Sequence, residues 1–292
     1  MFTNWTRNNR EKFTTLMIYF SGYLQTNPET QAQWYDSNGI LYSVPINAGK
    51  PMLTSSLSIN YTAPLDSKKL WSLSVGVSAG AYSSTSYQAS GTLPGVDKDT
   101  FDYSSFMSGF WGSAGGDRFY SGASGFREGS TISATPSGRV NVKYNQERYS
   151  LSVGTSVMGQ FSRYSLNPDF NRNTLDTRFT VLGQYTTRHN YELESDLAYV
   201  MYHGYADGFG KPEWHWNASV TKSIGAFNLS VTVHDILNQA RTLSHDATAN
   251  YVEDTYRLVM GRYVLFGVKW NFGKMNAVHN QRAQNAAWNL VW

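Results

Sequence analysis

The residues best suited to bind a ligand lie in one long stretch, 89–127, which is rich in glycine, aromatic rings and charges. Flat aromatic faces together with a few polar groups suit the capture of a sugar or a peptide. A connector between two elements of a compact domain rarely needs this many residues. The sequence therefore predicts a ligand-binding loop, and the alternative is a loop that only packs on itself or folds over its own domain. The candidate binding residues are Phe110, Trp111, Asp117, Arg118, Phe119 and Tyr120.

A row of carboxylates occupies every second position at Glu192, Glu194 and Asp196, so all three share one face of an extended strand. Asp176 and Arg178 take the polar face of the strand predicted before it. An acidic strip that faces a wet interior can guide cations or meet basic groups of another segment. The plainer alternative, which we favour, is that these side chains line the interior and are partly paired with Arg178.

Two patterns resemble metal sites without completing one. The stretch "DKDTFD" places Asp97, Asp99 and Asp102 close together, but it lacks the glycine and the final glutamate of a calcium-binding EF-hand loop. His215 and His234 both belong to the polar faces of neighbouring predicted strands, and no third ligand accompanies them. We therefore expect neither a bound metal nor a cofactor.

The sequence "SHD", Ser244 to Asp246, contains the residue types of a catalytic triad. Neighbours in sequence rarely reach the geometry in which a base activates a nucleophile and a third group orients the base. The chain has no cysteine, which excludes a thiol nucleophile, a disulfide framework and a zinc–thiolate site. No other residues combine a base, a nucleophile and an oxyanion site, so we predict that the chain is not an enzyme.

Apolar residues recur at every second position along almost the whole chain, which indicates β-strands. The last predicted strand is the clearest example, because one of its faces is wholly apolar and the other carries Lys269 and Asn271. No segment before residue 273 has a strong helical period. The apolar face of this last strand consists of Val264, Phe266, Val268, Trp270 and Phe272.

The predicted connectors alternate in length along the chain. Short turns at 7–11, 64–69, 145–148, 187–190 and 223–226 alternate with longer loops at about 26–38, 89–127, 163–173, 203–211 and 235–256. Short turns at one rim and long loops at the other are typical of outer-membrane β-barrels. A soluble β-sandwich, the main alternative, has strands that also alternate but no reason to keep this rhythm.

Composition also favours a barrel that spans a membrane. Charged residues are 15% of the chain and aromatic residues another 15%, yet the mean hydropathy is −0.42. Strands with one face in lipid and one in a wet interior have this mixture, and their aromatic rings gather near the strand ends. No run approaches the roughly 20 apolar residues of a transmembrane helix, and no secretory signal opens the chain. A net charge of +3 with one short basic cluster, Lys68–Lys69, argues against binding of nucleic acid.

The connectors predict about eleven strands, an odd number, whereas bacterial single-chain barrels generally have an even number. We therefore expect residues 1–272 to be the C-terminal part of a larger barrel, with the remaining strands supplied from elsewhere. Residues 273–292 follow the last strand as a tail that emerges on the side of the short turns, which is the periplasmic side.

Several stretches resemble the TonB-dependent receptors of Bacteroidetes. They are "NREKF" (9–13), "WYDSNGILYSVPIN" (34–47), "APLDSKK" (63–69), "DILNQ" (235–239) and "YVEDTYRLVMGRYVLFGVKWNF" (251–272). The resemblance implies a 22-stranded outer-membrane barrel, plugged by an N-terminal domain, that imports a ligand with energy passed on by TonB. It also implies that Val268, Trp270 and Phe272 form the signal that barrel-assembly machinery reads in a last strand.

These observations together predict a transporter or receptor that takes up a glycan, a peptide or a metal chelate across the bacterial outer membrane. Its partners would be the lipid bilayer, the N-terminal strands and plug of the same protein, TonB acting through that missing part, and other outer-membrane proteins. The second hypothesis is a structural or partner-binding barrel subunit, and an outer-membrane hydrolase is the third. Arg178, Glu192, Glu194, Asp196 and Lys269 are the expected lining of the lumen.

Overall fold

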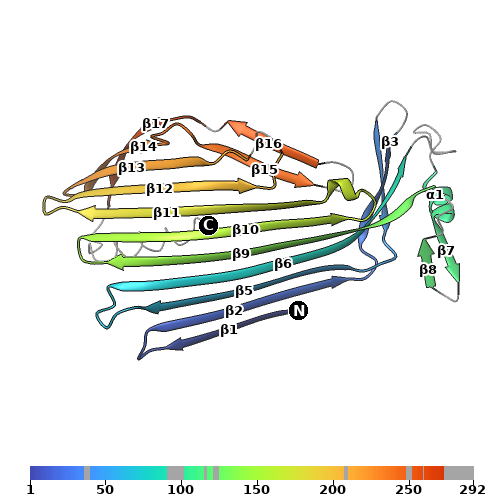
Figure 1. Ribbon diagram of the computed structural model, residues 1–292, viewed down its shortest axis with the longest axis horizontal. Helices are drawn as coiled ribbons and strands as arrows, with labels where there is room; N and C mark the ends of the chain where they lie inside the picture. The colour runs from blue at the N-terminus through green and yellow to red at the C-terminus, as the bar shows by residue number, and fades with distance from the viewer. Residues whose placement is uncertain are drawn as a thin grey trace.

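The computed structural model describes residues 1–35, 40–90, 102–114, 117–120, 125–206, 210–247, 252–258 and 260–272. The predicted all-β architecture is confirmed, because strands dominate the chain and one antiparallel meander holds most of them (Figure 1). Its eleven strands lie in the order β1-β2-β5-β6-β9-β10-β11-β12-β13-β14-β17. They are β1 (Phe2–Asn9), β2 (Thr14–Gln25), β5 (Met52–Pro64), β6 (Trp71–Ser90), β9 (Arg127–Asn145), β10 (Tyr149–Tyr164), β11 (Arg172–Thr186), β12 (Tyr191–His203), β13 (Glu213–Ile224), β14 (Phe227–His234) and β17 (Tyr263–Trp270).

The predicted rhythm of connections is confirmed. Short turns at 10–13, 65–70, 146–148, 187–190 and 225–226 lie at one end of the sheet, on the left of Figure 1, and all the long connections lie at the other. We call these ends the short-turn rim and the long-loop rim. Local chemistry explains two of these turns, because Asn190 and Gly225 adopt positive φ angles of 59°, which asparagine and glycine tolerate better than other residues.

The long connections contain structure that the sequence pattern did not predict. The first contains β3 (Glu29–Tyr35) and β4 (Leu41–Asn47), a hairpin whose first strand pairs in parallel with the end of β6. The second contains the helix α1 (Tyr103–Phe110) and the hairpin of β7 (Trp111–Ala114) and β8 (Asp117–Tyr120). A 3₁₀ turn, η1 (Pro168–Phe170), lies between β10 and β11, and β15 (Arg241–Ala247) pairs with β16 (Val252–Leu258).

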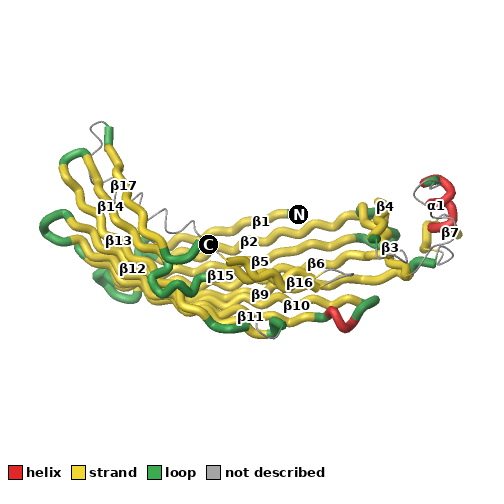
Figure 2. The backbone as a smooth tube through the Cα atoms, turned by 90° about the horizontal axis from the view of Figure 1, so that it is seen from above, coloured by secondary structure: helices red, strands yellow, loops and turns green. Residues whose placement is uncertain are grey.

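The sheet curves into an open trough, as Figure 2 shows. Within the described residues β1 pairs with β2 alone and β17 with β14 alone, so the chain by itself forms a sheet with two free edges. Both edge strands run from the long-loop rim to the short-turn rim. Direct pairing between them would therefore be parallel, and antiparallel closure needs an odd number of further strands.

In the described residues, a buried hydrophobic cluster lies at the long-loop rim and not beneath the sheet. It joins the β3–β4 hairpin to the end of β6 and to α1, and Trp34 packs edge-on against Phe126 with ring centroids 5.8 Å apart. Its buried members are Ala32, Trp34, Val44, Ile46, Ala48, Tyr87, Phe110 and Phe126. In the described residues, no helix is both long and apolar enough to cross a membrane.

Candidate functional site

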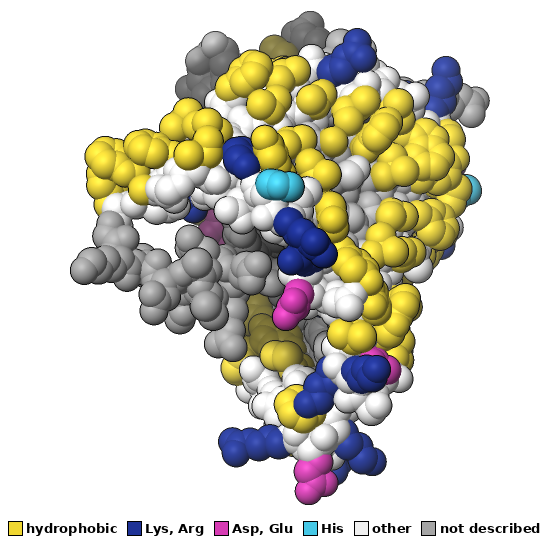
Figure 3. Space-filling view, turned by 90° about the vertical axis from the view of Figure 1, so that its left-hand side faces the viewer, with side chains coloured by type: hydrophobic (Ala, Val, Ile, Leu, Met, Phe, Trp, Pro, Cys, Tyr) yellow, Lys and Arg dark blue, Asp and Glu magenta, His cyan; other side chains and the backbone are white. Residues whose placement is uncertain are grey.

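The two faces of the sheet differ in chemistry. The outer, convex face carries the apolar members of each alternating pair, and these remain exposed, with Leu151 at 43% and Val153 at 48%. Figure 3 shows hydrophobic side chains gathered over this outer surface. The inner, concave face carries their polar neighbours, as in the hydrogen bond that Ser152 donates to Asn141 Oδ1 at 2.7 Å. A water-soluble sheet usually buries its apolar face, whereas the apolar face of this sheet stays exposed in the described residues.

Aromatic rings follow the outer face along the short-turn rim. Trp71 and Tyr144 lie opposite each other with ring centroids 4.7 Å apart, and Tyr149 is 5.5 Å from Tyr144 on the other side. The strand register continues the row, since Tyr149 faces Tyr185. The same rim ends at β14 and β17 with Phe227 stacked on Trp270 and with Phe272 against Trp270.

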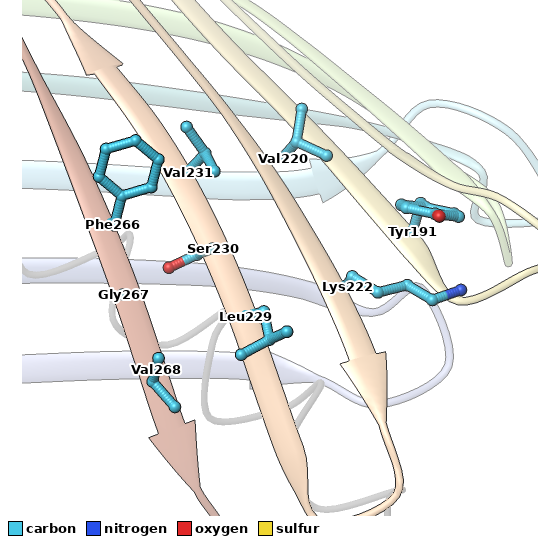
Figure 4. Close-up of a pocket in the computed structure, with 9 residues that line it drawn as sticks. All are labelled: Tyr191, Val220, Lys222, Leu229, Ser230, Val231, Phe266, Gly267 and Val268. Carbon is cyan, nitrogen blue, oxygen red and sulfur yellow. The ribbon is translucent and has the colours of Figure 1, made fainter.

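Lys222 is a cation on this outer face, and it lies at the rim. Its Nζ is 3.9 Å from the centroid of the Tyr191 ring and donates a hydrogen bond to the carbonyl of His189. Its long aliphatic stem therefore covers apolar surface, while the charge reaches the level of the turn. Beside it lies a shallow hollow of about 350 Å³ between β12, β13, β14 and β17, lined mainly by apolar side chains (Figure 4). Leu229, Val231, Phe266 and Val268 belong to this lining.

The predicted acidic strip lies on the inner face of β12. Each carboxylate accepts a hydrogen bond from a neutral side chain of a neighbouring strand. Gln184 donates to Glu192, Ser219 donates to Glu194 at 3.3 Å, and Asn217 donates to Asp196 at 2.9 Å. The three carboxylates therefore form one row on the inner face, and Glu192 and Glu194 lie in the half of the sheet nearer the short-turn rim.

Arg178 lies on the same inner face, opposite Val200 in the register of β11 and β12. Its guanidinium is near enough to Tyr202, Asp196 and Glu213 to interact with them electrostatically. Asp176 lies one pair of residues nearer the long-loop rim and accepts a hydrogen bond from the Tyr205 hydroxyl at 2.9 Å. Lys269 lies at the far side of this wall, opposite Asn228.

A buried carboxylate connects the inner wall to the long connection after β14. Glu213, only 1% exposed, accepts a hydrogen bond from the Tyr202 hydroxyl at 2.6 Å. Its second oxygen lies 3.5 Å from Arg241 Nε and 3.6 Å from His215 Nε2. Since Arg241 begins β15, its ion pair with Glu213 joins the base of the β15–β16 hairpin to the wall.

The motif "DILNQ" forms the turn that leads into this hairpin. Asp235, at a positive φ of 48°, accepts hydrogen bonds from the backbone N–H groups of Gln239 and Ala240 at 3.0 and 3.1 Å. The side chain of Asn238 accepts the N–H of Arg262 at 2.9 Å, and that of Gln239 accepts the N–H of Trp214 at 3.2 Å. The motif therefore joins the starts of β13 and β17 to the end of β14.

The candidate ligand-binding residues of the long loop do not form one described site. Phe110 is fully buried in the cluster at the long-loop rim, where its ring centroid is 5.0 Å from that of Tyr87. Phe110 therefore helps the long loop to pack, which is the alternative to ligand binding that the sequence left open. The other candidates belong to the β7–β8 hairpin, and their side chains lie outside the described part of the structure. These are Trp111, Asp117, Arg118, Phe119 and Tyr120.

Asp102 precedes the helix α1 and caps it. Its carboxylate accepts the backbone N–H of Ser105 at 2.8 Å. Hydrogen bonds from the Ser105 side chain and backbone lower the pKa of this exposed carboxyl from its ordinary value of 3.8. Asp102 thus acts as a helix N-cap, while Asp97 and Asp99 of the same acidic group lie outside the described residues.

The remaining patterns with catalytic or metal-binding residue types stay apart. His234 stacks on Tyr263 with ring centroids 4.7 Å apart, whereas His215 faces Glu213. Across the part of the chain that the structure describes, no three histidine, aspartate or glutamate side chains are placed to hold a metal. Ser244, His245 and Asp246 follow one another along β15, and their side chains lie outside the described residues, as does the tail 273–292.

Sequence reasoning missed three residues that organise the inner wall. Glu213 and Tyr202 lie at the ends of predicted strands, where the period of two no longer shows which face a residue takes. Asp235 has a clearer signal, because an aspartate directly after a strand often caps the turn that follows it. A buried glutamate flanked by Arg241 and His215 can be recognised only once strand pairing brings the three together.

Comparison of the chain with protein-family models, with curated proteins and with solved structures finds no match. The likeness to TonB-dependent receptors therefore stays a prediction from the sequence. The two faces of the sheet and its two rims are the observations from which function is argued.

Proposed function

We propose that this chain forms part of the wall of an outer-membrane β-barrel that takes up a ligand, in the manner of TonB-dependent receptors. The observation that carries the proposal is the exposed apolar outer face, bordered by aromatic rings and backed by a polar inner face. Such a face would make a water-soluble protein prone to aggregation, whereas in a bilayer it is the surface that contacts lipid.

The height of the apolar face suits a membrane. On β12 the outer aromatic residues Tyr191 and Tyr199 are eight positions apart, which is about 26 Å along a strand. On β10 Tyr149 and Phe161 are twelve positions apart, or about 40 Å. A tilt of about 40° reduces these lengths to roughly 20 and 30 Å, and the apolar band of such barrels is about 25 Å tall.

The soluble β-sandwich is the competing explanation, and the packing speaks against it. A sandwich buries the apolar face of one sheet against a second sheet about 10 Å away. Here the hairpins of the described residues lie in the long connections, and the buried hydrophobic cluster lies at the long-loop rim. Val153 and Phe179, in the middle of the meander, keep nearly half of their surface exposed.

Uptake is the activity that fits a wall with this inner face. The acidic strip and the cluster around Glu213 would line a hydrated interior, and the helix and hairpins at the long-loop rim would meet the ligand outside the cell. The free edges of β1 and β17 would pair with further strands, odd in number, that close the barrel. No cofactor is needed for this role, and catalysis is not part of the proposal.

Loss of this protein should impair growth on one class of nutrient. A strain that lacks the gene, compared with its parent on single oligosaccharides, peptides or ferric chelates as limiting source, should grow more slowly on at least one. Restoration by the intact gene is the control. Equal growth on every source would contradict uptake while leaving the membrane location open.

A second candidate function is a structural barrel subunit of an outer-membrane complex, and the two free edges favour it because separate chains could supply the missing strands. The intact mass of the native polypeptide in outer membranes distinguishes the two. A chain much heavier than 32.8 kDa, with the further strands in the same polypeptide, supports the receptor. A native mass of 32.8 kDa in a stable complex with other barrel proteins supports the structural subunit.

A further inference from the structure

The inner face of the sheet is mainly polar, but several exposed apolar side chains lie on it, and three of them gather on β1 and β2. The register places Phe2 opposite Ser21, Met17 opposite Asn60 and Tyr19 opposite Ser58, so all three share the face of these polar neighbours. Phe2, Met17 and Tyr19 are 66%, 45% and 38% exposed, and the rings of Phe2 and Tyr19 meet edge-on at 5.2 Å. We call these three residues the inner apolar patch.

An apolar patch on the inner wall differs from the lipid-facing surface. Ile18, between Met17 and Tyr19, points to the outer face with Trp5 and Ile59 as its neighbours. A bilayer that covers Ile18 would leave the inner patch in contact with water, where about 25 cal/mol is lost for each Å² of apolar surface left uncovered. The patch therefore calls for a covering segment that comes from within the trough.

We propose that the C-terminal tail, residues 273–292, docks along the inner wall, with its apolar end on the inner apolar patch and its basic part over the acidic strip. The tail leaves β17 at the short-turn rim after Phe272. It contains Lys274, Arg282 and one histidine but no acidic residue, and it ends in "WNLVW". Two features favour the tail as the segment that covers the inner wall. Its positive charges complement Glu192, Glu194 and Asp196, and its apolar end matches the inner apolar patch.

The distances permit this arrangement. The acidic strip on β12 lies three strand spacings from β17, about 14 Å along the sheet. The patch on β2 lies nine spacings away, about 43 Å along the curved wall and less across the trough. The sixteen residues from Phe272 to Trp288 span up to about 53 Å when extended, so the apolar end reaches the patch.

The heights agree as well. Met17 is the fourth residue of β2, and Glu192 and Glu194 are the second and fourth residues of β12, each counted from the short-turn rim. Met17 and these carboxylates therefore lie in the half of the trough into which the tail emerges, and Phe2, opposite the eighth residue of β2, lies farther along the wall. Lys269, on the inner face of β17, repels the basic part of the tail and favours its passage onward to the acidic strip.

Cross-linking tests the proposal cleanly, because the chain has no cysteine of its own. The double variant Met17→Cys with Trp288→Cys, in the native protein in isolated outer membranes, should form an intramolecular disulfide on oxidation. Ile18→Cys with Trp288→Cys is the matched control, since its strand residue is adjacent but faces outward. A second pair, Met17→Cys with Asn289→Cys, covers the case in which loss of Trp288 weakens docking.

The acidic strip gives an independent measurement. Changing Glu192, Glu194 and Asp196 to Gln, Gln and Asn should lower the cross-link yield several-fold, while Glu147→Gln in a short turn should leave it unchanged. Equal yields at positions 17 and 18, no disulfide in either Met17 pair, or disulfides that join two chains would each overturn the proposal. The docking proposal rests on the geometry of the inner wall and not on uptake. A negative cross-linking result would therefore leave the uptake proposal untouched, and a negative growth experiment would leave docking untouched.

Discussion

A single arginine placed on the outer face should distinguish lipid from water as the surroundings of this sheet. Val153 lies in the middle strand β10, opposite Val142 and Val181, with 48% of its surface exposed. If the outer face meets water, Val153→Arg is an exposed surface substitution and should change the free energy of unfolding by less than about 0.5 kcal/mol. If it meets lipid, arginine near the bilayer midplane should cost about 2–4 kcal/mol.

The neighbouring position supplies the control. Ser152 points to the inner face and bonds Asn141, so Ser152→Arg should lose about 1 kcal/mol for that hydrogen bond and nothing for desolvation. A cost of 2–4 kcal/mol reduces the folding equilibrium constant roughly 30- to 800-fold, since each 1.4 kcal/mol is a factor of ten. The difference between the two variants is thus well above experimental error.

The assay is urea-induced unfolding of the native protein in phospholipid vesicles, followed by the fluorescence of its nine tryptophans. The expected midpoint of Val153→Arg is far below that of the parent, and that of Ser152→Arg is close to it. Equal midpoints for the two variants would refute the assignment of the outer face to lipid.

Three further substitutions test the local structure. Gly204→Ala should destabilise the protein by more than about 1 kcal/mol, because φ is +81° and a Cβ would lie 1.8 Å from a backbone oxygen. Gly183→Ala is the control, since a Cβ there meets open space, and it should be neutral in the same unfolding assay. Ser105→Ala should raise the pKa of Asp102 toward 3.8, measured by NMR of labelled aspartate carboxyls, and an unchanged pKa would refute the contribution of the Ser105 hydroxyl. Because folding lowers that pKa, the cap stabilises the helix above pH 3.8 and this contribution is lost as the pH falls through the lowered pKa. Glu213→Gln should cost about 1.5–3 kcal/mol on unfolding, because it removes the charge from the buried group that accepts the Tyr202 hydroxyl and faces Arg241. A cost below about 1 kcal/mol would contradict the cluster.

The meander and its two faces were predictable from the sequence, because a period of two directly reports which side chains share a face. Along β12 the predicted alternation of Tyr191 and Leu193 with Glu192 and Glu194 is the observed alternation of outer and inner side chains. The lengths of the connections followed from the turn residues, as at 187–190.

The contents of the long loops were not predictable in the same way. The hairpin of β3 and β4 carries Pro45 in its second strand, and α1 is eight residues long, too short to show a helical period. Both are stabilised by contacts between distant segments, such as Trp34 with Phe106 and Phe126. For the same reason, the sequence predicted that the Phe110 ring would be accessible to a ligand, although tertiary packing buries it.

The most direct test of the account is a scan of single cysteines along β10, each carrying a nitroxide spin label, in the native protein in outer membranes. Labels at Leu151 and Val153 should collide mainly with oxygen dissolved in the lipid, and labels at Ser150 and Ser152 mainly with a water-soluble nickel complex. This alternation from one residue to the next is the predicted result. Labels that are all equally accessible to the nickel complex, whichever face they occupy, would contradict a wall with one side in the membrane.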